Sequence, residues 1–209
     1  MNVRGATEQD INSIVEVHIS AFPGFFLTTL GRSFLSELYV SFMTRKTGVL
    51  RVVCNGDDVV VGFSAGTSNP EYFYAQLRKD KWFQFLTKSI SGLIRNPLLV
   101  IRKLFYAFFY KGDTPADIHE AALLSSIGVS PAFAGQSLGK LLLKDFEIQI
   151  ESLGIPSVYL TTDKFGNDPV VGFYQRCNYK IESDFIQAGS RHMLRLMKTL
   201  KPENINDNT

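Results

Sequence analysis

The segment VSPAFAGQSLGKLLL, residues 129–143, combines a run of small side chains with the start of an apolar helical pattern. Its leucines recur at helical spacing, and no acidic residue stands at the beginning of the expected helix. The N–H groups at a helix start are unpaired and electropositive, so they bind anions where side chains leave room. The segment therefore predicts a phosphate or diphosphate site, with an ordinary turn packed by small residues as the alternative.

Two common nucleotide-binding motifs do not fit this segment. A P-loop needs a glycine where Ala134 stands, and a magnesium-binding Ser or Thr where Leu141 follows Lys140. No GxGxxG motif of a dinucleotide-binding fold is present. What remains is anion binding by consecutive backbone amides, which needs no metal.

A second segment, NDPVVGFYQRCNY at residues 167–179, combines helix-boundary residues with an aromatic pair, Phe173-Tyr174. Asn167 and Pro169 indicate a helix start, and Asn178 suits the left-handed backbone of a helix end. The phenol of Tyr174 has a hydroxyl group that can donate a hydrogen bond. The alternative for Tyr174 is a buried aromatic side chain that only packs.

The surrounding pattern indicates a mixed α/β order rather than a doubly wound parallel sheet. Asn55-Gly56 predicts a tight hairpin turn with positive backbone angles, and Thr7 with Asp10 predicts a helix cap. Strands are expected at 3–6, 49–54, 59–64, 121–129, 158–162, 179–187 and 191–197, and helices at 11–18, 27–42, 136–153 and 167–176.

Residues 69–118 are rich in aromatic side chains and are expected to form a helical insertion. Four basic residues interrupt its apolar run at 93–112, namely Arg95, Arg102, Lys103 and Lys111. Packing of this segment over one side of the predicted site is the first interpretation. The second is a helix on a membrane surface or on a lipid-linked substrate.

Length and composition favour one cytoplasmic domain at 1–200 with a polar tail at 201–209. The chain has 209 residues, with 22 basic and 20 acidic side chains and a formal charge of +2, so nothing in its charge indicates nucleic acid binding. Two cysteines in no metal-ligand spacing argue against a disulfide framework or a zinc site. The N-terminus lacks a signal-peptide pattern, and no apolar stretch is long enough to span a bilayer.

Together, the two segments and the element order resemble the GNAT acetyltransferase superfamily. The family's cofactor motif runs from a strand ending near Val129 into a [Q/R]xxGx[G/A] loop, here residues 134–139 with Ala134 and Ser137 at two of its positions. Its later motif, Nxx[A]xx[F/Y]YxxxG[F/Y], corresponds to residues 167–179. The resemblance implies a GNAT fold of the α+β class, with a mixed, mostly antiparallel sheet flanked by helices.

The resemblance also implies acetyl-CoA as co-substrate, no metal, and a set of site residues. Tyr174 would be the acid, while Phe25 and Phe26 would shape the acceptor pocket. Many relatives place a base on the strand before the loop, but the inward positions here are Leu123 and Ser125. The base is therefore expected at the strand's start, at Glu120 or His119, with Glu37 as another candidate and His18 as a packed core histidine. The residues expected to bind acetyl-CoA are Ile127, Gly128, Val129, Ala134, Gly135, Gln136, Ser137, Leu138, Gly139, Lys140, Asn167 and Tyr174.

The expected function is direct transfer of an acetyl group to the amine of a small molecule, for instance an amino sugar, by a monomer or homodimer. The alternative is a non-catalytic module of GNAT fold that binds CoA or has a regulatory role. Such a module could associate with a membrane surface through the insertion.

Overall fold

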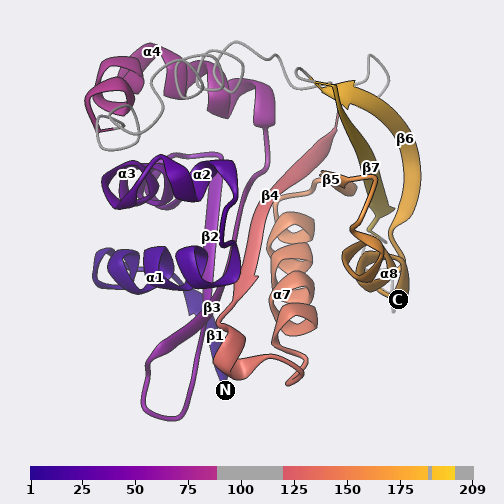
Figure 1. Ribbon diagram of the computed structural model, residues 1–209, viewed down its shortest axis with the longest axis horizontal. Helices are drawn as coiled ribbons and strands as arrows, with labels where there is room; N and C mark the ends of the chain where they lie inside the picture. The colour runs from indigo at the N-terminus through magenta and orange to yellow at the C-terminus, as the bar shows by residue number, and fades with distance from the viewer. Residues whose placement is uncertain (89–119, 188–189, 201–209) are drawn as a thin grey trace, which may run out of the picture.

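The computed structural model describes residues 1–88, 120–187 and 190–200 (Figure 1). Seven strands lie in these residues: β1 (Asn2–Gly5), β2 (Gly48–Cys54), β3 (Val60–Thr67), β4 (Ala121–Val129), β5 (Ser157–Asp163), β6 (Lys180–Gln187) and β7 (Arg191–Thr199). They form one sheet in the order β1-β2-β3-β4-β5-β7-β6, in which only β4 and β5 run parallel. The mixed, mostly antiparallel sheet confirms the expected fold class.

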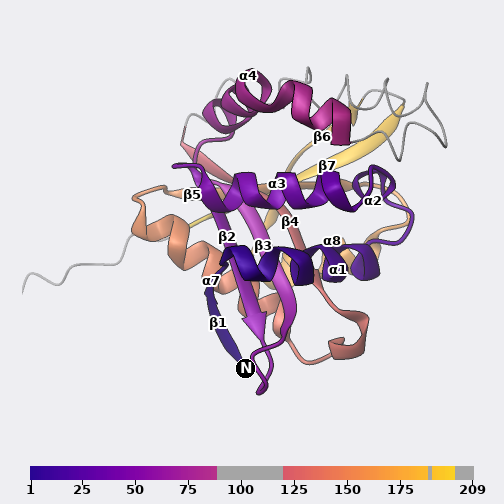
Figure 2. The same cartoon turned by 90° about the vertical axis from the view of Figure 1, so that its left-hand side faces the viewer.

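Helices cover both faces of this sheet. They are α1 (Ile11–Ala21), α2 (Phe26–Thr29), α3 (Arg32–Thr44), α4 (Pro70–Lys88), α7 (Leu138–Ser152) and α8 (Asp168–Arg176), with single 3₁₀ turns at Glu8–Asp10 and Pro131–Phe133. Figure 2 shows α4, α3 and α1 side by side over one face. On the other face, α7 and α8 share a core with β4, β5 and β7.

Two local predictions can be compared directly. The cap ahead of α1 is confirmed, because the Thr7 and Asp10 side chains and backbones bond reciprocally. The hairpin between β2 and β3 is also confirmed, but the expected positive angles at Asn55-Gly56 are wrong. The positive φ of 59° falls on Asp58, and the Asn55 side chain accepts hydrogen bonds from the backbone N–H groups of Asp57 and Val59.

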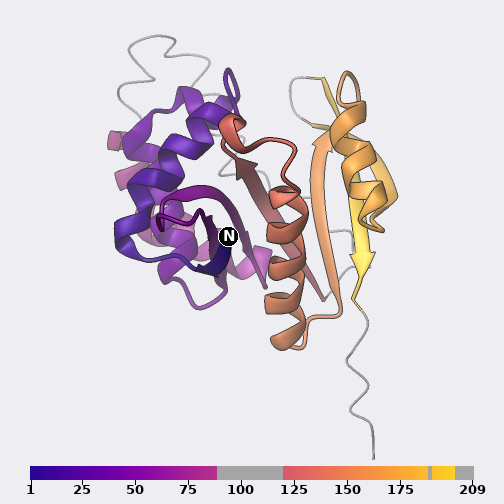
Figure 3. The same cartoon turned by 90° about the horizontal axis from the view of Figure 1, so that it is seen from below.

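A bulge in β4 determines where the sheet opens. Ala65 of β3 pairs with Ser126, whereas Gly66 pairs with Leu124, so Ser125 is the extra residue. A Cβ at Gly66 would lie 2.2 Å from the Leu123 carbonyl oxygen, which shows how closely the two backbones approach there. Because a bulge bends the strand that carries it, β4 turns away from β5. Their parallel pairing covers only Ala121–Leu123 against Ser157–Tyr159, and Figure 3 shows the two strands separating beyond that point.

The expected insertion at 69–118 is described only in its first part. There α4 packs on α3 through stacked Phe73 and Phe42 rings, whose centroids lie 4.7 Å apart. The segment at 93–112, with the four basic residues, lies outside the described residues, as do His119 and the tail at 201–209. None of the helices in the described part of the chain has the length and apolar character needed to cross a membrane.

Candidate active site

A cavity of about 520 Å³ occupies the opening between β4 and β5. Residues Leu124–Val129 of β4 form one wall, and residues Leu160–Asp163 of β5 form the other. The edge of β4 that faces the cavity lacks β5 as a pairing partner beyond Leu123. Backbone N–H and C=O groups on such an edge can hydrogen-bond an extended ligand, as in an added strand.

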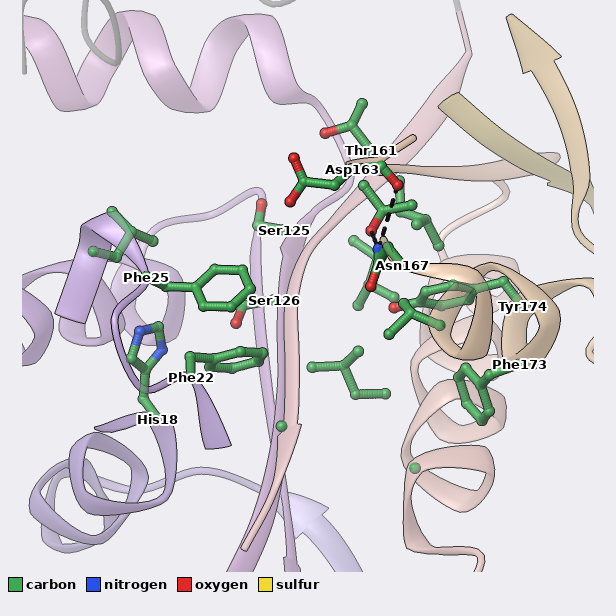
Figure 4. A pocket seen from close by; sticks show the side chains of 18 of the residues that line it. His18, Phe22, Phe25, Ser125, Ser126, Thr161, Asp163, Asn167, Phe173 and Tyr174 are labelled. Carbon is green, nitrogen blue, oxygen red and sulfur yellow. Dashed lines mark hydrogen bonds between the residues drawn. The ribbon is translucent and has the colours of Figure 1, made fainter. Parts of the chain in front are cut away.

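Aromatic side chains from α1 and the α1–α2 connection close one side of the cavity (Figure 4). Phe22, Phe25, Phe26 and Leu27 all line it, and the Phe22 ring packs at 4.9 Å from the ring of His18. Both predicted acceptor residues, Phe25 and Phe26, therefore lie at the cavity. Their role as acceptor contacts stays a prediction.

His18 is a core histidine, as expected, and it also lines the cavity. Its side chain is only 2% exposed, and its Nδ1 lies 2.6 Å from the hydroxyl of Tyr39. Burial lowers the pKa of His18 to about 4, so the imidazole is neutral at neutral pH. Burial also raises the pKa of Tyr39, and a hydrogen bond with the Ser126 side chain opposes that rise.

Polar groups gather at the end of β5. Arg191 of β7 donates two hydrogen bonds to the carboxylate of Asp163, because the β5–β7 register places the two side chains close together. Asn167, the residue before α8, donates from Nδ2 to the Thr162 hydroxyl at 2.6 Å. The Asn167 side chain thus ties the start of α8 to β5 instead of capping the helix.

The loop before α7 has the open backbone that the sequence predicted. Gly135 and Ser137 adopt positive φ angles of 78° and 59°. A Cβ at Gly135 would meet nothing within 4 Å, and no side chain caps α7. Ala134 donates its N–H to the Pro131 carbonyl, and the next turn of α7 begins with the bond from Leu141 to the Ser137 carbonyl. No side chain of the described residues therefore caps this helix start, and uncapped first-turn amides of this kind can bind an anion.

A second hollow of about 500 Å³ lies over this loop and adjoins the cavity. Val129, Gly139 and Phe173 line both spaces, so a groove runs from the start of α7 to the opening between β4 and β5. Lys140 and Arg176 line the outer hollow and give it positive charge. The geometry suits a long ligand with an anionic head and a narrow arm.

Tyr174 lies where the groove meets the cavity. Its ring is 6% exposed, packs against Phe173 and Tyr179, and lines the cavity. Figure 4 shows its hydroxyl pointing into the cavity. Burial raises the pKa of Tyr174, and the nearby Cys177 adds to the shift, so the phenol stays protonated and can donate.

The structure brings together most of the predicted cofactor residues. Those that line the cavity or the outer hollow are Ile127, Gly128, Val129, Ala134, Gly135, Ser137, Leu138, Gly139, Lys140, Asn167 and Tyr174. Gln136 is exposed and lines neither. Their contacts with acetyl-CoA stay predictions.

The predicted base is placed apart from this cavity. Glu120 is exposed in the turn before β4 and does not line the cavity, which begins four residues further along at Leu124. Glu37 is buried on α3 and does not belong to the described lining either. The expectation that Leu123 and Ser125 are the inward positions of β4 is wrong for Leu123, because the bulge at Ser125 breaks the alternation.

Sequence reasoning missed Ser126, Asp163 and Arg191. Ser126 follows the bulge, and a bulge in β4 has no signal in the sequence. Asp163 and Arg191 are 28 residues apart and meet only through strand pairing. Among the described residues, no group of three His, Cys, Asp or Glu side chains is arranged as metal ligands.

Comparison with known proteins supports this geometry. A family model described as the acetyltransferase (GNAT) family matches residues 106–179, which include the α7 loop and Tyr174. No curated protein sequence matches the chain.

Solved structures resemble the whole chain. Ard1 from Thermoplasma volcanium has a TM-score of 0.60 at 13% identity, covering 96% of this chain and 97% of its own. Naa20 from Chaetomium thermophilum, solved with a bisubstrate analogue, has a TM-score of 0.60 at 13% identity, with coverage of 99% and 90%. The PaiA N-acetyltransferase from Thermoplasma acidophilum, solved with coenzyme A, has a TM-score of 0.58 at 14% identity, with coverage of 93% and 96%.

The match to the acetyltransferase (GNAT) family is thus confined to residues 106–179, and the solved structures share the fold of the whole chain.

Proposed function

We propose that the protein transfers the acetyl group of acetyl-CoA to the primary amine of a small molecule, within one cytoplasmic domain that spans residues 1–200. The observation that carries this proposal is the continuous groove from the α7 start to the Tyr174 hydroxyl. It matches a ligand with a diphosphate at one end and a reactive thioester at the other. An amino sugar belongs among the acceptors to be tested.

The residues of the groove have separate tasks in binding. The amides of residues 135–140 hold the diphosphate, and Lys140 and Arg176 add positive charge beside it. The free edge of β4 at Ile127–Val129 pairs with the amide-bearing arm. Acetyl-CoA supplies an activated acyl group. The residues of this chain therefore have to bind and orient the two substrates and to exchange protons with them.

The transfer is a direct attack. The amine nitrogen forms a bond to the thioester carbonyl carbon, the carbon–sulfur bond breaks, and Tyr174 gives a proton to the departing sulfur. A backbone N–H near Val129 polarises the carbonyl oxygen. The amine proton leaves through water, with Glu120 as the proposed base at the far end of that path. No covalent intermediate with the enzyme forms.

The experiment is thiol release from acetyl-CoA in the presence of a panel of primary amines, followed by mass spectrometry of the products. Amine-dependent release with an N-acetyl product supports the proposal. CoA binding with no release from any amine would instead support a non-catalytic CoA-binding module. Two observations favour that second candidate: Ser137 occupies the left-handed backbone position in the loop, and Glu120 lies outside the cavity.

A further inference from the structure

Two charged side chains lie in the wall of the cavity, and a bound molecule can reach both. Asp163 and Arg191 line the space between β4 and β5, and their side chains are 30% and 46% exposed. Figure 4 shows the Asp163 carboxylate extending from β5 toward the cavity. The other titratable side chains of the described lining, His18 and Tyr174, are buried and uncharged at neutral pH. The charges that a ligand meets in this lining are therefore those of one ion pair.

The ion pair leaves hydrogen-bonding capacity on both partners. Arg191 donates to the Asp163 carboxylate from Nε and Nη2. The guanidinium carries further N–H groups on Nη1 and Nη2, and each carboxylate oxygen keeps a lone pair after accepting one bond from Arg191. Donors of a cation and acceptors of an anion are thus offered side by side at the cavity.

A pair of adjacent opposite charges selects a ligand with the complementary pair. A simple ammonium ion is attracted by Asp163 but repelled by Arg191, and a simple carboxylate meets the reverse. A zwitterion sets each of its charges against the opposite charge of the protein. Because Asp163 and Arg191 are in direct contact, they match ammonium and carboxylate groups on one carbon better than charges at the two ends of a chain.

The strand order determines the direction in which such a ligand lies. Asp163 on β5 borders the opening beside β4, whereas Arg191 is on β7, one strand further from β4. The thioester is expected along β4, so the reacting nitrogen falls to Asp163 and the carboxylate falls to Arg191.

The remaining wall of the cavity is apolar. Phe25 is 51% exposed and packs on Phe22 with ring centroids 5.5 Å apart, and both side chains line the cavity. An apolar side chain on the ligand removes this surface from water. We propose that the acceptor is an α-amino acid with an apolar side chain, whose ammonium and carboxylate groups bind Asp163 and Arg191. The inference rests on the acetyl-transfer function proposed above and names the class of its acceptor.

Three compounds that share one ring test this inference. Phenethylamine lacks only the carboxylate of L-phenylalanine, and hydrocinnamate lacks only its ammonium group. Their affinities for the full-length protein are measured by calorimetry with saturating CoA. We expect L-phenylalanine to bind about tenfold more tightly than either, since each analogue loses a charged hydrogen bond. Glycine and glucosamine, which lack the apolar side chain, should also bind more weakly.

Two variants assign the charges, and a third is their control. In Arg191→Gln, the preference over phenethylamine should disappear or reverse, because Asp163 without its counter-ion repels the ligand carboxylate. In Asp163→Asn, the preference over hydrocinnamate should fall below about twofold. Lys164→Gln removes a neighbouring positive charge, which pairs with Asp184 outside the described lining, and both preferences should persist. A ratio of two affinities within one protein does not depend on how much of that protein is folded.

Equal wild-type affinities for L-phenylalanine and phenethylamine would overturn the inference, as would tighter binding of glycine or glucosamine, or the same ratios in Arg191→Gln and Lys164→Gln. Thiol release from acetyl-CoA with other amines but not with L-phenylalanine would overturn it as well. The proposed function fails separately, if CoA does not bind or if no amine releases thiol. The calorimetric ratios then still show whether the amino-acid site exists.

Discussion

His18 should lower the free energy of unfolding in mild acid, because its imidazole is buried in the neutral form. Burial lowers its pKa from the usual 6.5 to about 4. The folded state therefore resists a proton that the unfolded state accepts. The stabilising contribution is complete above the unfolded pKa of 6.5, and it is lost as the pH falls from there through the folded pKa.

The size of the stability loss follows from the difference between the unfolded and folded pKa of His18. Each unit of pKa corresponds to about 1.4 kcal/mol, so the full loss is about 3 kcal/mol, of which about 2 kcal/mol occurs between about pH 7.5 and pH 5. The assay is urea unfolding at several pH values across this window for the wild-type protein and for His18→Asn. The variant starts from a lower stability, since a buried ring is truncated, and the comparison concerns only the change with pH.

We expect the wild-type free energy of unfolding to fall by about 2 kcal/mol more than that of the variant over this window. Carboxylates that titrate in the same range contribute to both proteins and cancel in the difference. Parallel pH curves for the two proteins would refute the reasoning, because His18 would then take up its proton equally well in both states.

Three further predictions concern the site. Tyr174→Phe should lower kcat about a hundredfold. The affinity for acetyl-CoA should stay unchanged, because no described residue bonds to the hydroxyl. Thiol-release kinetics measures kcat and calorimetry measures the affinity; an unchanged kcat removes the acid role. Ser137→Gly should raise the free energy of unfolding by about 1 kcal/mol, since glycine adopts a φ of 59° without the steric cost that a side chain has there. A denaturant titration that shows no gain in stability would contradict this. Glu120→Gln should lower kcat/KM at least tenfold, because the proposed base is lost. Steady-state kinetics with a reactive amine measures this, and a change below twofold excludes Glu120 as the base.

Much of the fold could be predicted because its signals are local. The helix beginning at Leu138 follows from leucine spacing, and the start of α8 follows from Pro169 in its first turn. Each of these features depends on neighbours within one or two turns. The order of strands and helices then indicates a mixed sheet. The two short motifs supply the loop before α7 and Tyr174, which line adjoining parts of one groove.

The parts that could not be predicted depend on contacts between distant segments. The bulge at Ser125 arises from the pairing of β4 with β3, and it changes which side chains face the cavity. The buried pair of His18 and Tyr39 joins α1 to α3, so helical periodicity shows that His18 is buried but not what it contacts. The same holds for Asp163 and Arg191, which meet only across the β5–β7 register.

Binding of acetyl-CoA to two matched variants tests the central claim, that free amides at the start of α7 hold a diphosphate. Both Asn and Asp tolerate the left-handed backbone and the helix-capping position of Ser137, but only Asp places a negative charge at the amides. In calorimetric titrations, we predict that the wild-type protein and Ser137→Asn bind acetyl-CoA with affinities within a few-fold of each other and that Ser137→Asp does not bind measurably. Absence of binding by the wild-type protein, or equal binding by the Asp and Asn variants, would contradict the account.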